Sequence, residues 1–89
     1  PKVKSEILNL QKLEVNVYPV PMDQILNFNS NKLIYQVSIY NSLGKEIQHG
    51  IINNYHSKLD CSHFEGGVYV IQIQCADGSL FSSKLLKIK

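Results

Sequence analysis

The fold is decided by the stretch from Gly66 to Cys75, which reads GGVYVIQIQC. Apolar side chains recur at every second position, at Tyr69, Ile71 and Ile73, and glutamines fall between the later ones. This period of two is typical of a β-strand with one face in the core. Valines on either side of Tyr69 place apolar side chains on the opposite face as well. We therefore expect both faces of this strand to be covered by other parts of the protein, and the strand to lie in the middle of a sheet.

The residues after this strand predict a hairpin. Ala76-Asp77-Gly78 is a turn signal, and its length follows from the register of the two strands that it joins. A two-residue loop would place Ile73 opposite Ser82, whereas a three-residue loop places it opposite Phe81. We expect the three-residue loop, with Gly78 in the left-handed conformation.

A last strand is then expected over Leu80–Lys89. The three-residue loop sets Tyr69 opposite Leu85, so Phe81 and Leu85 point inward while Lys84 has the opposite parity and reaches water.

Length and composition indicate one small globular domain. The chain has 89 residues, 44% of them hydrophobic and 18% charged, with a net charge of +2. It contains neither Arg nor Trp, the usual residues for phosphate binding and base stacking, so nucleic acid is not an expected partner. No apolar run approaches the about 18 residues of a membrane helix.

The rest of the chain carries short strand patterns separated by turn signals, and no segment shows a sustained helical period. Seven strands in all predict an all-β fold, a small immunoglobulin-like sandwich of about seven antiparallel strands. The five earlier strands are expected over Leu13–Val17, Leu26–Phe28, Leu33–Tyr40, Lys45–Ile52 and Tyr55–Cys61.

Three details of these strands are specific. Pro19 and Pro21 hold the residues before them extended and remove backbone donors, which predicts a rigid corner after the first strand. In the third strand the odd-numbered side chains, from Leu33 through Tyr35 to Ile39, are expected on the inner face. A three-residue loop with Gly44 left-handed would then set Ile39 opposite Ile47.

The first residues have no clear pattern. Residues 1–12 are interpreted as a linker from an upstream cargo domain, and residues 13–89 as the folded domain. The beginning lacks an initiating Met and the apolar core of a signal peptide, so we expect the chain to be a fragment of a longer protein.

No catalytic, cofactor or metal site is predicted. The group most similar to a catalytic or zinc site is Cys61 with His63 and His56. Cys61 and His63 share a strand face, but the group lacks the closely spaced ligand pairs of a zinc site. Cys61 and Cys75 either form one disulfide or remain separate core thiols. Six aromatic residues are expected in the core more than in a sugar-binding groove. They are Tyr18, Tyr35, Tyr40, Tyr55, Phe64 and Tyr69.

Four motifs occur in a specific order along the chain. They are Val17-Tyr18-Pro19-Val20-Pro21, Val37-Ser38-Ile39-Tyr40-Asn41-Ser42-Leu43-Gly44-Lys45, Leu59-Asp60-Cys61-Ser62-His63-Phe64-Glu65-Gly66-Gly67-Val68-Tyr69-Val70 and Lys84-Leu85-Leu86-Lys87. Together they resemble the type A C-terminal sorting domain of the type IX (Por) secretion system over roughly Leu13 to Lys89. The chain differs from the family's usual pattern at Val20, where Asn is common, and at Cys61, where a small or polar residue is common.

The resemblance implies a domain that serves as an address and is not an enzyme. It implies a cargo protein that crosses the periplasm of a Gram-negative bacterium and is secreted or displayed on the cell surface. Implied partners are an outer-membrane translocon, its shuttle protein and a sortase-like surface peptidase that cuts before the domain, in or near residues 1–12.

The resemblance also assigns roles to particular residues. The sorting residues implied are Lys84, Leu85, Leu86, Lys87, Ile88 and Lys89. The structural motif residues implied are Tyr18, Pro19, Pro21, Gly44, Gly67, Tyr69 and Gly78. On residue chemistry alone, the lysines of the last strand are also typical of a solvated edge that discourages aggregation.

Two questions stay open at this stage. An accessory module, immunoglobulin-like and binding glycan or protein beside an extracellular enzyme, is the alternative function. A homodimer formed by strand exchange is a further alternative for the oligomeric state.

Overall fold

The computed structural model describes residues 12–88, so the predicted linker falls almost wholly outside the described residues. These residues form five antiparallel strands. The strands are β1 (Val15–Tyr18), β2 (Ile25–Tyr40), β3 (Glu46–Asp60), β4 (Gly67–Cys75) and β5 (Leu80–Lys87). No helix in this part of the chain is long and apolar enough to cross a membrane.

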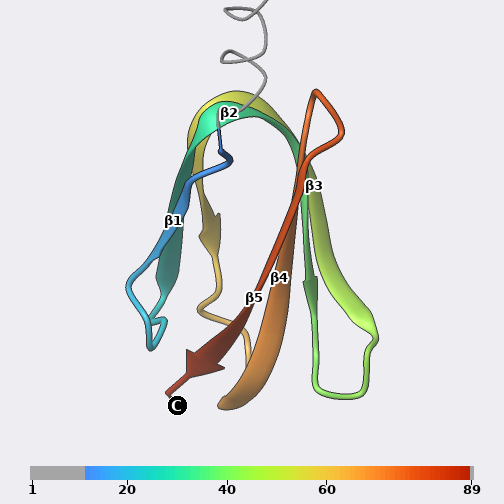
Figure 1. Ribbon diagram of the computed structural model, residues 1–89. Helices are drawn as coiled ribbons and strands as arrows, with labels where there is room; N and C mark the ends of the chain where they lie inside the picture. Colours follow the sequence, from blue (N-terminus) through green and yellow to red (C-terminus); the bar gives the residue numbers. More distant parts are fainter. Residues whose placement is uncertain (1–11, 89) are drawn as a thin grey trace, which may run out of the picture.

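One continuous sheet joins all five strands. β2 pairs with β3 along one side, and on its other side with β1 over its first half and β4 over its second half; β5 then pairs with β4. The long strands β2 and β3 arch over together, so that their two halves face each other across the core (Figure 1). The molecule is therefore an open, curled antiparallel sheet.

The expected seven-strand sandwich is not confirmed. Two pairs of predicted strands are each one long strand, because the turn signals between them are irregularities inside the ladder. The register of β2 and β3 shifts between Asn29 and Ile34, and Asn53 has φ of 51° in the middle of β3. Bulges of this kind bend a strand without ending it.

The C-terminal hairpin has the predicted register. Ile73 pairs with Phe81 and Tyr69 with Leu85, and Gly78 has φ of 95°. β4 also lies between β2 and β5, as predicted. Its outer face is less covered than predicted, because Val68 is 46% exposed.

The first hairpin is only partly as predicted. Gly44 is left-handed, with φ of 86°, but Ile39 pairs with Gln48 and not with Ile47. The reason is a register shift between Ile39 and Tyr40, which inserts an extra residue on β3. Ile47 still packs against the core.

A second shift changes which face of β2 is buried. The register of β2 moves between Ile34 and Gln36 against both of its neighbours. Ile34 is consequently buried and Tyr35 is 43% exposed, opposite to the prediction. Val37 and Ile39 are buried as predicted, so both halves of β2 face the same core.

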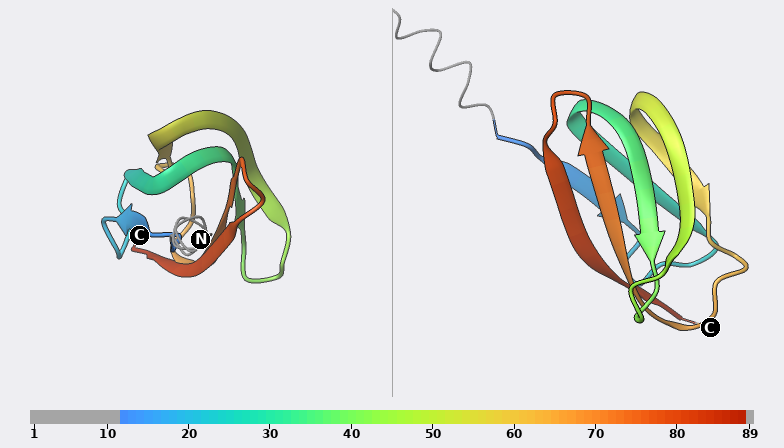
Figure 2. Two further views of the ribbon diagram at one scale, coloured as in Figure 1. Left: turned by 45° about the horizontal axis from the view of Figure 1, so that its top comes forward. Right: turned by 90° about the vertical axis from the view of Figure 1, so that its right-hand side faces the viewer.

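The two ends of the curled sheet differ. At one end, the Asn31 side chain donates to Lys12 O at 2.7 Å, and the neighbouring Lys32 forms an ion pair with Asp77 of the β4–β5 turn at 3.1 Å. The described chain thus enters beside the β4–β5 turn, and the end of β5 lies at the opposite end of the molecule (Figures 1 and 2).

We predict that Gly78→Ala destabilises the domain by about 1–2 kcal/mol, because a side chain is unfavourable in the left-handed region. Gly50→Ala is the matched control: Gly50 has no positive φ, and an added Cβ has nothing within 4 Å at either position. It should change stability by no more than about 0.5 kcal/mol. Urea unfolding measures both; equal losses would mean that the turn conformation is not the cause.

A pH-dependent contribution is expected from Asp77. The hydrogen bonds that Asp77 accepts from Ser79, and then the one from Lys32, lower its pKa to about 2. Because the folded pKa lies below the ordinary value, the stabilisation is complete above about pH 4 and declines as the pH falls toward about 2. Asp77→Asn keeps an oxygen acceptor but not the charge. The difference in melting temperature between wild type and variant should therefore shrink between about pH 5 and about pH 2; a constant difference would contradict the assignment.

Candidate functional site

The end of β5 contacts the segment from Pro19 to Pro21, the proline corner, at one end of the molecule. Met22, the first residue after Pro21, donates its N–H to Leu86 O at 2.7 Å and forms a parallel bridge with Lys87. Both peptide bonds before the prolines are cis. This closing contact joins segments that are far apart in the sequence and completes the curl of the sheet at this end.

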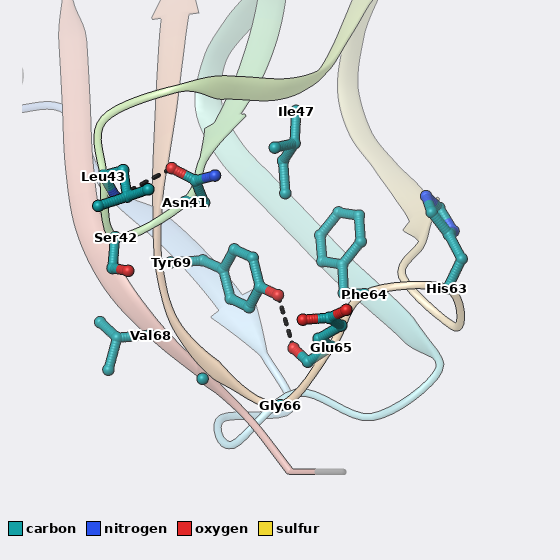
Figure 3. Close-up of a pocket in the computed structure, with 11 residues that line it drawn as sticks. Asn41, Ser42, Leu43, Ile47, His63, Phe64, Glu65, Gly66, Val68 and Tyr69 are labelled. Carbon is teal, nitrogen blue, oxygen red and sulfur yellow. Dashed lines mark hydrogen bonds between the residues drawn. The ribbon is translucent and has the colours of Figure 1, made fainter.

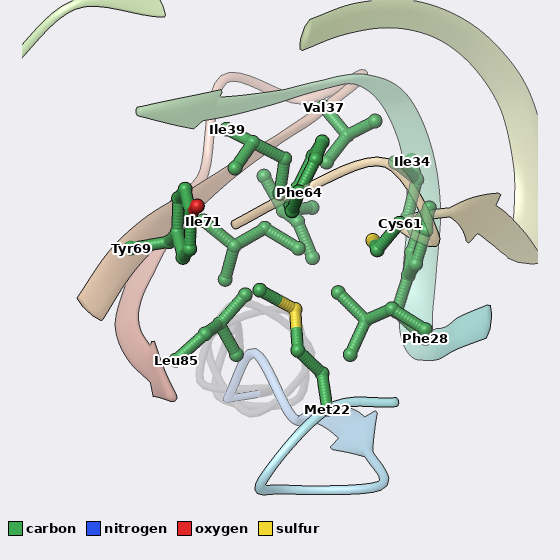
Figure 4. Packing of buried hydrophobic residues seen from close by; sticks show 12 residues of the cluster. Met22, Phe28, Ile34, Val37, Ile39, Cys61, Phe64, Tyr69, Ile71 and Leu85 are labelled. Carbon is green, nitrogen blue, oxygen red and sulfur yellow. The ribbon is translucent and has the colours of Figure 1, made fainter. Parts of the chain in front are cut away.

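The side chains at the closing contact enter the core. Met22 is 1% exposed and Leu85 is 2% exposed, and both point into the buried cluster that also contains Phe28 and Ile71 (Figure 4). The end of β5 is therefore held by a backbone hydrogen bond on one side and by apolar packing on its inner face. Met22 was not among the predicted site residues. The signal available was an apolar residue directly after two prolines, outside any strand pattern.

The last strand alternates strictly. Lys84, Leu86 and Ile88 are exposed, whereas Leu85 and Lys87 are buried. Lys84 and Leu85 have the predicted orientation. The solvated edge expected for the lysines of the last strand is wrong for Lys87, which is only 7% exposed and shares the inner face with Leu85. Lys89 lies outside the described residues.

Lys87 lines an open hollow together with the next residue, Ile88, and with residues from two other segments. A lysine can pack its aliphatic stem inside while its ammonium group stays at the hollow's surface. The other lining residues are Asp23, Gln24, Ser62, Phe64, Glu65 and Ile88.

The loop between β3 and β4 is tied to the same end. Cys61 donates its N–H to Gln24 O at 2.6 Å, and Phe64 donates to Cys61 O at 3.0 Å. The rings of Phe64 and Tyr69 stack with centroids 5.1 Å apart, and the Tyr69 hydroxyl donates to Glu65 O at 2.5 Å. The loop is thus fixed between the start of β2 and the inner face of β4.

A second hollow opens between this loop and the β2–β3 turn (Figure 3). Asn41 fixes the turn, because its side chain accepts the N–H groups of Leu43 and Lys45 at 2.9 and 3.0 Å. Among the described residues that line it, Glu65, His63 and Tyr69 are titratable, and none of them is paired there with a serine or cysteine nucleophile. The turn with Gly44 therefore lies beside the β3–β4 loop and the start of β4, where Gly67 and Tyr69 lie.

The structure brings three of the four sequence motifs directly together. The proline corner contacts the end of β5, and the Cys61–Glu65 loop contacts the residues that follow the corner. The fourth motif, with Gly44, borders the same loop through the second hollow. Gly78 lies elsewhere, at the β4–β5 turn.

The histidines and cysteines do not form a reactive group. Cys61 is buried, but His63 is exposed in the following turn, so the expected shared face is wrong. Burial, and then the charge of Asp60, raise the pKa of the Cys61 thiol, while the charge of Lys87 opposes this rise. A thiol with a raised pKa is a poor nucleophile and metal ligand. Within residues 12–88 no three His, Cys, Asp or Glu side chains cluster to hold a metal ion.

One arrangement has the composition of a hydrolytic triad but not its geometry. Ser38 Oγ lies 3.1 Å from His49 Nδ1, and Glu46 lies 3.6 Å from the same nitrogen. A triad needs the two ring nitrogens to serve different partners. This group therefore cannot pass a proton from the serine toward the carboxylate.

The structure has no disulfide between Cys61 and Cys75; both are free, buried thiols. Cys61 follows Asp60, which pairs with Ile25 at the start of β2, whereas Cys75 pairs with Ile34 beyond its middle. Cys75 also lies outside the core cluster that contains Cys61. The alternative of two separate thiols is the one observed.

The aromatic side chains divide between core and surface. Phe64 and Tyr69 are buried as expected, and Tyr40 is half-buried. The expectation of core packing is wrong for three tyrosines on three different strands, each 43 to 52% exposed. These are Tyr18, Tyr35 and Tyr55.

Comparison with known proteins identifies the family. Comparison with curated proteins gives no match. Among solved structures, the crystal structure of CopC from Methylosinus trichosporium OB3b is similar, with a TM-score of 0.50 and 16% sequence identity over 86% of this chain and 87% of that chain. At this identity the similarity concerns the fold alone. The family described as "Secretion system C-terminal sorting domain" matches residues 16–88, which is nearly all of the described part. The chain therefore belongs to the C-terminal sorting domains of the type IX secretion system.

Proposed function

We propose that this domain directs its cargo protein across the outer membrane, and that the machinery reads the exposed side of the end of β5. Family membership implies interaction with the type IX secretion machinery and a secreted or cell-surface cargo. The observation that supports this surface is the alternation at the end of β5. Lys84, Leu86 and Ile88 point to solvent, and the residues between them hold the strand in place.

The exposed side has the character of a recognition surface. Leu86 pairs directly with Val68 of β4, and the two are 45% and 46% exposed, so they form an apolar pair on the outer face. In the next row, Lys84 pairs with the half-buried Val70 and supplies a positive charge. Apolar contact provides affinity and the charge favours one partner over others.

The alternation also separates recognition from folding. Removing Lys84–Lys89 as a block would delete the buried Leu85 and the closing contact along with the exposed residues. Such a deletion tests the need for the strand as a whole, whereas substitutions confined to exposed positions test recognition.

The fate of the cargo follows from the same proposal. The protein reaches the periplasm of a Gram-negative bacterium, and the outer-membrane translocon and its shuttle protein bind this domain. A sortase-like surface peptidase then cuts within the linker at residues 1–12 and attaches the cargo to the cell surface. This proposal rests on the family match.

The export test uses a reporter with a signal peptide, fused ahead of the chain and produced in a bacterium with a type IX system. The double variant Lys84→Glu/Leu86→Ser should reduce reporter at the surface and in the medium at least tenfold, with the reporter retained in the periplasm. Both positions are exposed, so each substitution should change stability by no more than about 0.5 kcal/mol. Cell fractionation measures export, and thermal unfolding of the purified domain measures stability.

Two control variants accompany this test. Lys58→Glu/Ile51→Ser makes the same kinds of change at exposed positions of β3 and should be exported normally. Leu85→Ala should lose about 3 kcal/mol of stability by leaving a cavity, and its export should fail through unfolding. Normal export of the Lys84→Glu/Leu86→Ser variant would contradict the proposed recognition surface and favour an accessory module.

A further inference from the structure

The backbone of β5 has one free edge, which two hydrogen bonds identify. Ser79 O accepts the N–H of Cys75 at 2.8 Å, so odd-numbered residues of this segment direct their backbone groups toward β4. Leu86 O accepts the N–H of Met22, on the opposite side. Because backbone groups alternate along a strand, the N–H and C=O groups of Leu80, Ser82 and Lys84 point away from β4.

No other strand of the described chain uses this edge. β5 pairs with β4, and on its other side only Met22 bridges to it, at Lys87. β1 pairs with β2 and not with β5. In residues 12–88 the edge from Leu80 to Lys84 therefore carries backbone donors and acceptors that no strand pairs.

Of the sheet edges, that of β5 is the most regular. β4 and β5 pair over eight consecutive positions with no register shift. The edge strand β3 is interrupted by shifts against β2 and by the positive φ of Asn53, features that discourage strand addition. β1 has four residues and ends at Tyr18, directly before Pro19. A partner strand would thus find its longest regular template on β5.

The side chains beside the free edge define the partner's chemistry. On the inner face, Phe81 of β5 packs against the core but is only partly buried. On the outer face, Lys84 is exposed and has no ion-pair partner within residues 12–88. An added strand would therefore place apolar side chains against Phe81 and an acidic side chain beside Lys84.

The closing contact sets the limit of the added strand. Met22 already occupies the edge at Leu86, so pairing is confined to about the five positions from Leu80 to Lys84. Main-chain pairing of this length supplies affinity whatever the cargo, and alternating side chains supply the choice of partner.

We propose that a short extended segment of the type IX machinery, with alternating apolar and acidic residues, adds to the free edge of β5 as an extra strand. This inference rests on the proposed function and states how the recognition surface is engaged. The closing contact at Met22 fixes the end of this strand, and a fixed strand presents a regular edge to a partner.

Backbone amide exchange of the chain tests the edge directly. In the free chain, the amides of Ser82 and Lys84 should exchange at least hundredfold faster than those of Ser83 and Leu85, which point toward β4. The chain is then bound to outer-membrane vesicles from a secreting strain, and vesicles from a translocon-deficient strain serve as the control. After exchange, the chain is released from the vesicles, and NMR measures the exchange of each backbone amide. Secreting vesicles should slow Ser82 and Lys84 at least tenfold, and the control vesicles should not.

A different occupant of the β5 edge would give a different result in the exchange experiment. Protection of Ser82 and Lys84 already in the free chain would overturn the proposal, because a second copy or residues 1–11 would then cover the edge. Dilution distinguishes these two, since only a second copy dissociates. Unchanged exchange on secreting vesicles would equally overturn it.

A variant pair tests the edge in cells with the same reporter. Ser82→Pro removes only an N–H that points away from β4, so the ladder with β4 stays intact, whereas an added strand loses a donor and meets the ring. Its export should fall at least tenfold. Ser82→Ala retains the N–H and should be exported normally.

The two variants distinguish a failure of the edge-pairing proposal from a failure of the proposed recognition by β5. If Ser82→Pro is exported normally while Lys84→Glu/Leu86→Ser is not, edge pairing is wrong and the sorting function stands. If both are exported normally, the proposed recognition by β5 fails as well. Should Ser82→Pro prove unfolded, the exchange experiment on the unmodified chain decides.

Discussion

The structure depends on the pairing of β2, which contacts three of the other four strands. Its inward side chains are even-numbered in the first half, at Leu26 and Phe28, and odd-numbered in the second, at Val37 and Ile39. The shift between Ile34 and Gln36 makes this exchange of parity. Between these two positions β2 has one residue more than its partner β4. Without this extra residue, one half of β2 would turn its apolar face to water.

Much of the fold could be predicted where the decisive information is local. The β4–β5 register follows from Gly78 and from matching the apolar faces of two neighbouring strands. The irregularities in β2 and β3 could not be predicted in the same way, because Asn29 to Asn31 and Asn53 to Asn54 are equally typical of a turn and of a bulge. The burial of Ile34 in place of Tyr35 is then decided by pairing with β4, which is distant in sequence.

The motifs of the candidate site could be predicted, but the contact between Met22 and the end of β5 could not. Alternation alone places Lys87 inside with Leu85, whereas its charge argues for the surface. Lys87 lines an open hollow with Asp23 and Glu65, and a buried stem with its ammonium group toward such a hollow is compatible with both. The role of Met22 depends on the meeting of the proline corner with a strand more than half the chain away. No local pattern carries that contact.

Lys12 and the closing contact lie at opposite ends of the sheet. Under the proposed function, the length of β5 is the distance between the point where the cargo is attached and the end that the machinery binds. Lys12 enters beside the β4–β5 turn, and the closing contact lies at the far end of β5. Eight residues of extended strand separate these points by about 25 Å. Under the proposed function, a bulky protein fused ahead of Lys12 would be held at this distance from the end of β5 that the machinery binds, so that binding would not depend on the size or shape of the fused protein.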